Sequence, residues 1–323
     1  MHPHGETGPF VGALDFGGTK VSGALVDAEG RLRVRVLRPT PAGESGESVM
    51  RAVLEVLGEL RAAPEWPAVV AVGIGSAGPV DARRGTVSPV NVPGWRDFPL
   101  VPRVSAAVGG LPVVLTGDGV AMTAAEHWFG AARGYDNALC MVVSTGVGGG
   151  LVLGGALLPG PTGNAGHIGH ISVDLDGDSC PCGSRGCVER IASGPNIARR
   201  ALDSGWRPAA GTAPTAAAVA DSARSGDPLA RASFDRAAQA LAAGVAAIAT
   251  LVEIQVAVVG GGVANAGPVL FDPLRGHLSR YATLSFAARV KVVPAGLGTD
   301  AGLVGAAAAA AGALGIKAFT LPG

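Results

Sequence analysis

Two glycine-rich turns are the first candidates for chemistry in this sequence. One runs from Asp15 to Lys20 with the letters DFGGTK, and the other runs from Ser144 to Gly150 with the letters STGVGGG. Glycines let backbone N–H groups approach phosphate oxygens, Thr and Lys side chains add polar contacts, and a carboxylate can hold a hydrated Mg²⁺ ion. Either turn alone could be an ordinary hairpin. Together they predict phosphate binding at Asp15, Gly17, Gly18, Thr19, Lys20, Thr145, Gly146 and Gly148.

A third glycine cluster, Gly260–Gly262, follows the apolar run Val256–Val259. Glycines at the end of a strand permit a flat ligand such as adenine to approach the backbone, and they also form tight turns. We take Gly261 and Gly262 as candidate ATP contacts, with a tight turn as the alternative.

Candidate metal ligands gather in the string GHISVDLDGDSCPCGSRGC, which contains His170, Cys180, Cys182 and Cys187. In a reducing cytoplasm, such closely spaced cysteines favour a metal over disulfides. Three thiolates and one imidazole complete a tetrahedral Zn²⁺ site with no open position, which predicts a structural zinc. Reduced core cysteines without a metal are the alternative. The fourth cysteine, Cys140, lies in a predicted strand and is expected to be a small core residue.

The elements around the two turns indicate an internal duplication. Residues 10–27 and 138–153 each have the pattern of strand, turn and strand. Strands alternate with helical patterns in both halves, so the predicted class is α/β with two duplicated lobes and a cleft between them. We place the N-terminal lobe at 1–117 plus about 301–323, where an Ala-rich helix would pack back, and the C-terminal lobe with the zinc motif at 118–300.

The expected helices and strands follow from apolar spacing and from turn residues. Helices are expected over Glu47–Ala62, Asp118 to about Ala131, Pro195–Asp203, Thr215–Arg224, Pro228–Leu251 and Ala301–Leu314. Strands are expected over Phe10–Leu14, Val21–Val26, Ala68–Ile74, Leu111–Leu115, Val256–Val259 and Val290–Val293.

Composition excludes several classes of protein. Of the 323 residues, 48% are hydrophobic and 15% are charged, and 25 basic residues balance 25 acidic ones. The chain therefore has the apolar surface for an ordered core, and it lacks the basic runs that bind nucleic acid. The start lacks the pattern of a signal peptide, so we expect a cytoplasmic protein. The apolar stretch from about Ala240 to Ala264 is interrupted by Glu253 and Gln255, which favours a buried helix followed by a strand over a membrane span.

Four motifs in this order, D-x-G-G-T-K, S-T-G-x-G-G-G, G-H-I-G-H and C-P-C-G-S-R-G-C-V-E, resemble the ROK family (repressors, open reading frames, kinases) across nearly the whole chain. The resemblance implies an actin-like ATPase (ribonuclease H-like) fold and often a homodimer or homotetramer. It also implies transfer of the γ-phosphoryl group of ATP, with Mg²⁺, to a sugar hydroxyl that is usually the one at C6.

The resemblance assigns roles to particular residues of this chain. Asp118 falls at the family's catalytic Asp, which accepts the proton of the sugar hydroxyl and orients its oxygen. The same residue could also be a helix N-cap. Glu189 matches a Glu that hydrogen-bonds the sugar, and Gly78 falls at a further sugar contact. His170 matches a residue that binds zinc through one ring nitrogen and the sugar through the other, so zinc would set its orientation.

Two positions depart from the family's glucokinase pattern. Gly117 stands where the family usually has an Asn that binds sugar, so a backbone group or water replaces that side chain, or the sugar differs. His167 stands where glucokinases usually carry Glu, as in bacterial N-acetylmannosamine kinases. A neutral imidazole both donates and accepts hydrogen bonds, unlike a carboxylate. We expect a hexose kinase with altered sugar preference, and an amino-sugar kinase is the alternative.

Three other classes of protein compete with a kinase. A ROK repressor would need a helix-turn-helix domain before the first turn, and only nine residues precede Phe10. A zinc-ribbon binding module does not fit the neutral charge. A sugar-binding protein without catalysis has the support of Gly117 alone, and an ATP consumption assay would separate it from a kinase.

Overall fold

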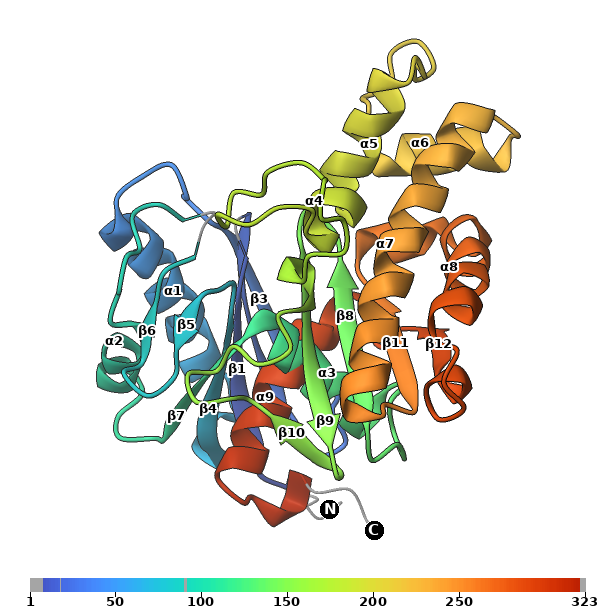
Figure 1. Ribbon diagram of the computed structural model, residues 1–323. Coiled ribbons are helices and arrows are strands. Elements are labelled where there is room, and N and C mark those ends of the chain that lie inside the picture. Colours follow the sequence, from blue (N-terminus) through green and yellow to red (C-terminus); the bar gives the residue numbers. More distant parts are fainter. Residues whose placement is uncertain (1–7, 18, 90–91, 320–323) are drawn as a thin grey trace, which may run out of the picture. The chain divides into compact units, whose positions relative to one another are not determined.

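The structure is a computed structural model that describes residues 8–17, 19–89 and 92–319 (Figure 1). Gly18, a predicted phosphate contact, lies outside the described residues. The chain divides into two compact units, each described here by itself. Unit 1 comprises the described residues up to Arg133, the segment Leu157–Ala165 and the described residues from Thr299. Unit 2 comprises Gly134–Ala156 and Gly166–Gly298.

Unit 1 is built on a five-stranded sheet in the order β3-β2-β1-β4-β7. Strand β1 pairs antiparallel with β2, and β2 pairs antiparallel with β3, whereas β1, β4 and β7 are parallel. The strands are β1 (Phe10–Phe16), β2 (Lys20–Val26), β3 (Leu32–Pro39), β4 (Val69–Ser76) and β7 (Val113–Gly117), and β5 (Val80–Asp81) pairs with β6 (Thr86–Val87) beside them.

Unit 2 repeats this sheet. Its strand order is β10-β9-β8-β11-β12, with β8 antiparallel to β9 and parallel to β11, which is in turn parallel to β12. The strands are β8 (Ala138–Val143), β9 (Val147–Leu153), β10 (Ala156–Leu158), β11 (Val256–Gly260) and β12 (Lys291–Pro294). The first antiparallel pair of each sheet contains one glycine-rich turn, so the duplication predicted from the two hairpins is confirmed.

The helices of unit 1 cover both faces of its sheet. They are α1 (Gly46–Arg61), α2 (Leu100–Ala107), α3 (Asp118–Phe129) and α9 (Ala301–Ala313). Helix α1 begins where the Ser45 hydroxyl accepts the Ser48 N–H, and its apolar stripe is buried against the sheet. Helix α9 consists almost entirely of Ala, Gly, Leu and Val, and it is buried along most of its length. Figure 1 shows it, in red, beside the blue strands of the same unit.

Small residues allow α9 to lie very close to its neighbours. A Cβ on Gly73 of β4 would lie 2.0 Å from the carbonyl oxygen of Ala306, and one on Gly305 would lie 1.8 Å from that of Ala121 in α3. Helix α3 therefore packs directly against α9, and both belong to unit 1. The structure thus places the boundary elsewhere than the predicted 117/118: residues 118–133 lie in unit 1 because α3 needs α9 as its partner.

The segment Leu157–Ala165 also belongs to unit 1, where the prediction had assigned it to the C-terminal lobe. Its anchor is Asn164, whose amide group makes two hydrogen bonds with the backbone of Val80. The Val80 N–H donates to Asn164 Oδ1 at 3.2 Å, and Asn164 Nδ2 donates to the Val80 carbonyl at 2.7 Å. Such side-chain contacts over a long sequence separation leave no periodic signal in the sequence.

The helices of unit 2 are α4 (Val188–Ala192), α5 (Gly194–Asp203), α6 (Ala216–Arg224), α7 (Pro228–Val252) and α8 (Pro268–Tyr281). Helix α7 begins with Pro after the N-cap Asp227, and it ends at Glu253 in the left-handed conformation. Among the described helices, α7 is the one long and apolar enough to cross a membrane by length and composition, and half of its apolar window is buried. The predicted helix followed by a strand is confirmed as α7 and β11.

Candidate active site

The parallel strands of unit 1 bring three predicted residues to one edge of the sheet. Strand register pairs Asp15 with Gly75, and Ser76 with both Phe16 and Gly117. Since the carboxyl ends of parallel strands lie at the same edge, Asp15 at the end of β1, Gly78 just after β4 and Asp118 just after β7 are grouped there. The first glycine turn, between β1 and β2, lies at this edge too.

Asp118 is the first residue of α3, and Gly117 is the N-cap. The N-cap is therefore Gly117, one residue before Asp118, which the sequence suggested for this position. Its carboxylate accepts the N–H of Gly119 at 2.7 Å, and the residue is exposed. The carboxylate of Asp118 is therefore held by the backbone at the start of α3 and remains accessible.

The carboxyl group of Asp15 is partly buried, and its pKa is raised to about 6. Burial is the largest cause, the negative charge of Asp118 adds to it, and the positive charge of Lys20 opposes both. A carboxyl group held in this way gains from a nearby cation. This is the environment expected of a residue that holds a hydrated Mg²⁺ ion.

Asp15 also lies against the first turn of α9. A Cβ on Gly302 would be 2.7 Å from Asp15 Cγ and Oδ2, so only glycine fits beside the carboxyl group. The sequence analysis did not select Gly302. Its signal was a glycine in the first turn of an Ala-rich helix, but nothing in the sequence pairs that helix with β1.

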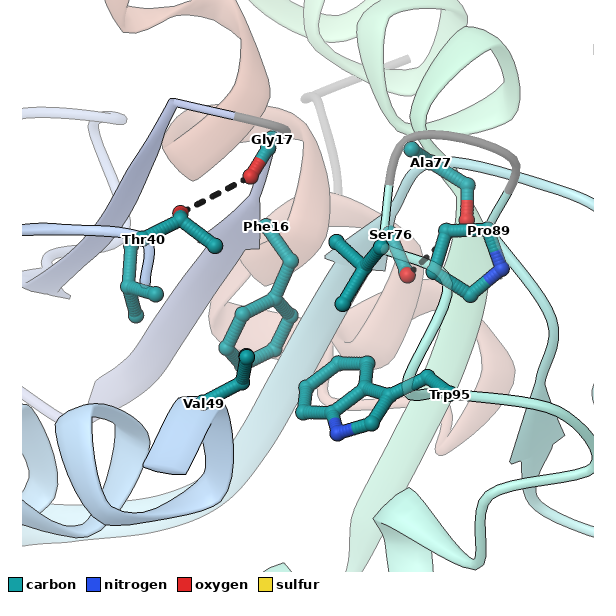
Figure 2. Close-up of a pocket in the computed structure, with 10 residues that line it drawn as sticks. Phe16, Gly17, Thr40, Val49, Ser76, Ala77, Pro89 and Trp95 are labelled. Carbon is teal, nitrogen blue, oxygen red and sulfur yellow. Dashed lines mark hydrogen bonds between the residues drawn. The ribbon is translucent and has the colours of Figure 1, made fainter. Parts of the chain in front are cut away.

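The first glycine turn is held from outside by Thr40. The Gly17 N–H donates to the Lys20 carbonyl at 3.0 Å, which closes the turn. The Thr40 N–H donates to the Thr19 carbonyl at 3.0 Å, and the Thr40 hydroxyl donates to the Gly17 carbonyl at 2.9 Å, as Figure 2 shows. Thr40 therefore forms hydrogen bonds with residues on both sides of the turn. Nothing in the sequence indicates this role.

Behind this turn lies a small cavity, lined by Phe16, Gly17, Thr40, Val49, Ser76 and Trp95 among others (Figure 2). Its volume is 10 Å³. That space suits about one water molecule and is far too small for a sugar or a nucleotide. The cavity lies behind the turn and is not itself a substrate site.

The second glycine turn, in unit 2, meets the third glycine cluster. Strands β8 and β11 are parallel with Val142 opposite Gly260, so the turn after β8 and the glycines after β11 lie at one edge. Gly261 has φ +88°, and a Cβ on Gly262 would be 3.5 Å from Ser144 Oγ. Thr145, Gly146, Gly261 and Gly262 are thus grouped as predicted, whereas Gly148 lies inside β9 and pairs with Val142.

Backbone and side-chain bonds fix the second turn from both ends. The Ser144 N–H donates to the Gly146 carbonyl at 2.8 Å, and the Gly194 N–H donates to the Ser144 carbonyl at 2.7 Å. The Val147 N–H donates to Glu189 Oε2 at 2.8 Å. Glu189, predicted as a sugar contact, therefore also touches the second glycine turn.

The four predicted metal ligands come together in unit 2. One donor atom from each of His170, Cys180, Cys182 and Cys187 lies within 4.8 Å of all the others. The Cys182 and Cys187 sulfurs are 3.7 Å apart, and Cys180 Sγ is 4.0 Å from His170 Nδ1. A tetrahedral site with Zn–S bonds of about 2.3 Å separates two sulfurs by about 3.8 Å, so the four donors fit Zn²⁺.

The surroundings of these thiols shift their pKa values in different directions. Burial raises the pKa of the Cys187 thiol to about 12, and the neighbouring Cys180 and Cys182 add to the rise. The backbone hydrogen bond of Ser184 lowers the pKa of the exposed Cys182. A metal held by these cysteines would have to displace the proton of Cys187, so its binding would release protons.

Contacts other than the candidate metal ligands also hold the loop that carries the cysteines. Gly186 has φ +58°, and a Cβ there would lie 1.7 Å from the Asp174 carbonyl oxygen, so the chain requires glycine at this position. Arg236 pairs with Asp174, and Arg199 pairs with Asp178 at 3.0 Å. These ion pairs fasten the loop to α7 and α5.

The predicted sugar-binding histidines lie side by side. The rings of His167 and His170 are nearly parallel, with centroids 5.6 Å apart. His170 faces Cys180 with Nδ1, which leaves Nε2 for a second partner. His167 is exposed. The arrangement agrees with a metal-oriented His170 beside a freer His167.

The space beside Gly117 is limited on one side. A Cβ there would be 3.3 Å from the Gly163 carbonyl oxygen, and Gly163 precedes the anchored Asn164. An Asn at position 117 would crowd this carbonyl. A side chain at residue 117 would require the Gly163 backbone to shift by a few tenths of an ångström.

Comparison with known proteins gives one family. The model of the ROK family matches residues 11–313. A glucokinase from Thermotoga maritima is 38% identical over 306 residues, which cover 91% of this chain and 95% of the relative. An N-acetylmannosamine kinase from Yersinia pseudotuberculosis is 38% identical over 300 residues, covering 91% and 96%. A solved ROK family glucokinase from Streptomyces griseus, in complex with glucose and AMPPNP, has a TM-score of 0.79 at 36% identity, covering 93% of this chain and 99% of that chain.

Proposed function

The chain belongs to the ROK family, and from this premise we propose that it is an ATP-dependent sugar kinase that phosphorylates the 6-hydroxyl of glucose or a related hexose or hexosamine. The family and the duplicated actin-like α/β fold, both expected from the sequence, are confirmed. One observation carries the proposal further: Asp118, Asp15 and the first glycine turn lie at one sheet edge of unit 1. A proton acceptor, a cation ligand and a phosphate-binding turn are the groups that phosphoryl transfer requires.

Asp118 would act as the catalytic base. Its carboxylate accepts the proton of the sugar hydroxyl while holding that oxygen in line with the γ-phosphorus. The oxygen forms a bond to phosphorus, the bond from phosphorus to the bridging oxygen of ATP breaks, and ADP leaves with the electron pair. Because the transition state is loose, the alignment of the hydroxyl matters more than the basicity of Asp118.

The two glycine turns would bind the phosphates of ATP. Gly17, Thr19 and Lys20 in unit 1, and Thr145 and Gly146 in unit 2, supply N–H groups, hydroxyls and one ammonium. Gly18 and Gly148 complete the set predicted from the sequence. Asp15 would hold Mg²⁺, which neutralises charge on the phosphates when it is bound. The adenine would lie near Gly261 and Gly262.

Zn²⁺ would be structural and would act on the sugar indirectly. His170, Cys180, Cys182 and Cys187 would hold it, which leaves no open position for a substrate. The ion would fix the His170 ring so that Nε2 meets a sugar hydroxyl, and Glu189 follows Cys187 closely in the chain. Gly78 would add a backbone contact to the sugar.

His167 favours an amino sugar as a second candidate substrate. It stands exposed beside His170, at the position where the family's glucokinases usually carry Glu. An N-acetylmannosamine kinase is also among the relatives at 38% identity. An imidazole can donate a hydrogen bond to an acetyl oxygen, which a carboxylate cannot do.

A coupled assay of ADP release tests the proposal. It would cover glucose, mannose, fructose, allose, glucosamine, kanosamine, N-acetylglucosamine and N-acetylmannosamine, with the unaltered protein and His167→Glu. ADP release with at least one sugar supports the kinase, and a shift of kcat/KM toward glucose in His167→Glu supports the role of His167. Sugar binding without ADP release from any sugar would instead support a noncatalytic sugar-binding or regulatory protein.

Assembly and location are part of the proposal. The assembly rests on the family resemblance, and the location and the expected partners rest on the sequence features described above. The protein would form a homodimer or homotetramer and work in the cytoplasm on small molecules, without nucleic acid or membrane partners. Light scattering after size-exclusion chromatography measures the assembly directly, and a monomer at micromolar concentration would contradict it.

A further inference from the structure

A residue in the first turn of α4 contacts the second glycine turn. This residue is Glu189, which is also a proposed sugar ligand. We propose that Glu189 is a positioning residue for this turn, so that one carboxylate links sugar binding to nucleotide binding. The inference rests on the proposed kinase function and adds a physical connection within unit 2.

The contact between Glu189 and the turn is short and well placed. Glu189 Oε2 accepts the N–H of Val147, the residue directly after the turn, at 2.8 Å. Val147 is 3% exposed, so its N–H has little access to water and depends on this acceptor. A Cβ on Gly146 would lie 2.7 Å from the same oxygen. The carboxylate therefore lies directly against the backbone of the turn.

The other end of the turn is held by the same part of the chain. Gly194, the first residue of α5, donates its N–H to the Ser144 carbonyl at 2.7 Å. Asn196 Nδ2 donates to the Glu189 carbonyl at 3.2 Å and to Ser193 Oγ at 2.7 Å. The junction of α4 and α5 thus fixes both ends of the turn, while Thr145 at its tip stays exposed.

A carboxylate has two oxygens, and here they have separate tasks. Within the described part of the chain, the Val147 N–H is the donor that the Glu189 side chain accepts, through Oε2. Oε1 is then the oxygen for a sugar hydroxyl. A sugar bound to Oε1 restrains the whole carboxylate and therefore restrains the turn. By linkage, nucleotide bound at the turn must favour the sugar by the same factor.

The main readout is nucleotide binding without sugar, which does not depend on which sugar is the substrate; sugar affinity is measured separately with a sugar that supports ADP release. Binding of AMPPNP with Mg²⁺ is titrated by calorimetry for the unaltered protein, Glu189→Ala and Glu189→Gln. Loss of a hydrogen bond to a charged group should weaken AMPPNP about tenfold in Glu189→Ala. Glu189→Gln keeps an acceptor for Val147, so its AMPPNP affinity should remain within about threefold of the unaltered value, while sugar affinity falls because the charge is lost.

Gly146→Ala supplies a second, independent arm. Gly146 does not have a positive φ, so alanine fits its backbone and collides only with the Glu189 carboxylate. We expect Gly146→Ala to weaken AMPPNP binding about tenfold in the unaltered background. It should have little further effect in the Glu189→Ala background, because substitutions of contacting residues do not have additive effects. Melting temperature and zinc content of each variant show whether unit 2 is intact.

The outcomes separate the inference from the function that it rests on. If Glu189→Ala binds AMPPNP like the unaltered protein and loses only sugar affinity, Glu189 is a sugar ligand alone and the inference is wrong. Additive effects of the two substitutions would overturn it as well. If the unaltered protein does not bind AMPPNP at all, the proposed kinase function fails first. Non-additive loss, with Glu189→Gln retaining nucleotide affinity, supports the inference.

Discussion

The charge of Asp118 acts on Asp15 across the edge of the unit 1 sheet and helps to raise the pKa of the Asp15 carboxyl group to about 6. The two carboxylates have different surroundings, because Asp15 is partly buried against α9 and Asp118 is exposed at the start of α3. Unequal environments allow two carboxyl groups to take different roles. Asp15 suits a cation, and Asp118 suits a hydroxyl proton.

The pH dependence of activity should reflect Asp15. Its pKa is raised, so the carboxyl group takes up a proton as the pH falls through about 6 and then cannot hold a cation. We expect kcat/KM to fall about tenfold per pH unit below that value. Lys20→Met tests the assignment, because it removes the positive charge that lowers the pKa of Asp15. The fall of kcat/KM should then begin at a higher pH. A pH profile that is flat down to pH 4.5 would contradict the assignment.

Replacement of the proposed base should stop catalysis without stopping nucleotide binding. Asp118→Asn keeps the shape of the side chain and removes its ability to accept a proton, so kcat should fall by about 10²- to 10⁴-fold. The Kd for AMPPNP, measured by calorimetry, should change by less than about threefold. Glu55→Gln, an exposed acid on α1, is the control and should keep full kcat. A near-normal kcat in Asp118→Asn would remove Asp118 as the base.

Loss of one cysteine ligand should release the metal and weaken sugar binding. Cys182→Ser should contain little zinc by elemental analysis, and its KM for sugar should rise about 10- to 100-fold as His170 loses its fixed orientation. Cys140→Ala is the control: it removes a thiol in β8, outside the ligand cluster, and should keep its zinc. A zinc-free Cys182→Ser protein with an unchanged KM would refute the indirect role of the metal.

Loss of the Thr40 hydrogen bond to the first glycine turn should weaken ATP binding and leave sugar binding unchanged. Thr40→Val has nearly the same shape but cannot donate to the Gly17 carbonyl, so KM for ATP should rise about three- to tenfold. Thr40→Ser retains the hydroxyl and should behave almost like the unaltered protein. Equal changes of KM for ATP and for sugar in Thr40→Val would indicate a general loss of structure instead.

The sequence predicts the parts of this protein whose signal is local. Both glycine turns show as Gly-Thr runs between β-rich segments, and the metal ligands show as cysteines at close spacing. The structure groups His170 with the three cysteines and places Asp118 at the end of a strand. The turn residues and the metal ligands are neighbours in the chain or repeat along it, whereas the role of Asp118 comes from the family resemblance.

Contacts between distant segments are what the sequence does not reveal. Nothing near Thr40 indicates that its hydroxyl reaches Gly17, and nothing near Gly302 indicates that Asp15 lies beside it. No helix is predicted over the residues of α8, which contains Pro273 in its interior, where proline usually interrupts a helix. The lobe boundary was misplaced because α3 packs against α9, a helix at the other end of the chain.

Helix α9 has a consequence for how the protein is made. It buries Leu303, Ala306 and Ala310 against Val11 and Ala13 of β1, yet all of unit 2 precedes it in the chain. On the ribosome, every residue of unit 2 therefore emerges before the helix that covers one face of the unit 1 sheet. Unit 1 begins first and is completed last, and its nascent strands must remain free of aggregation while the whole of unit 2 is translated.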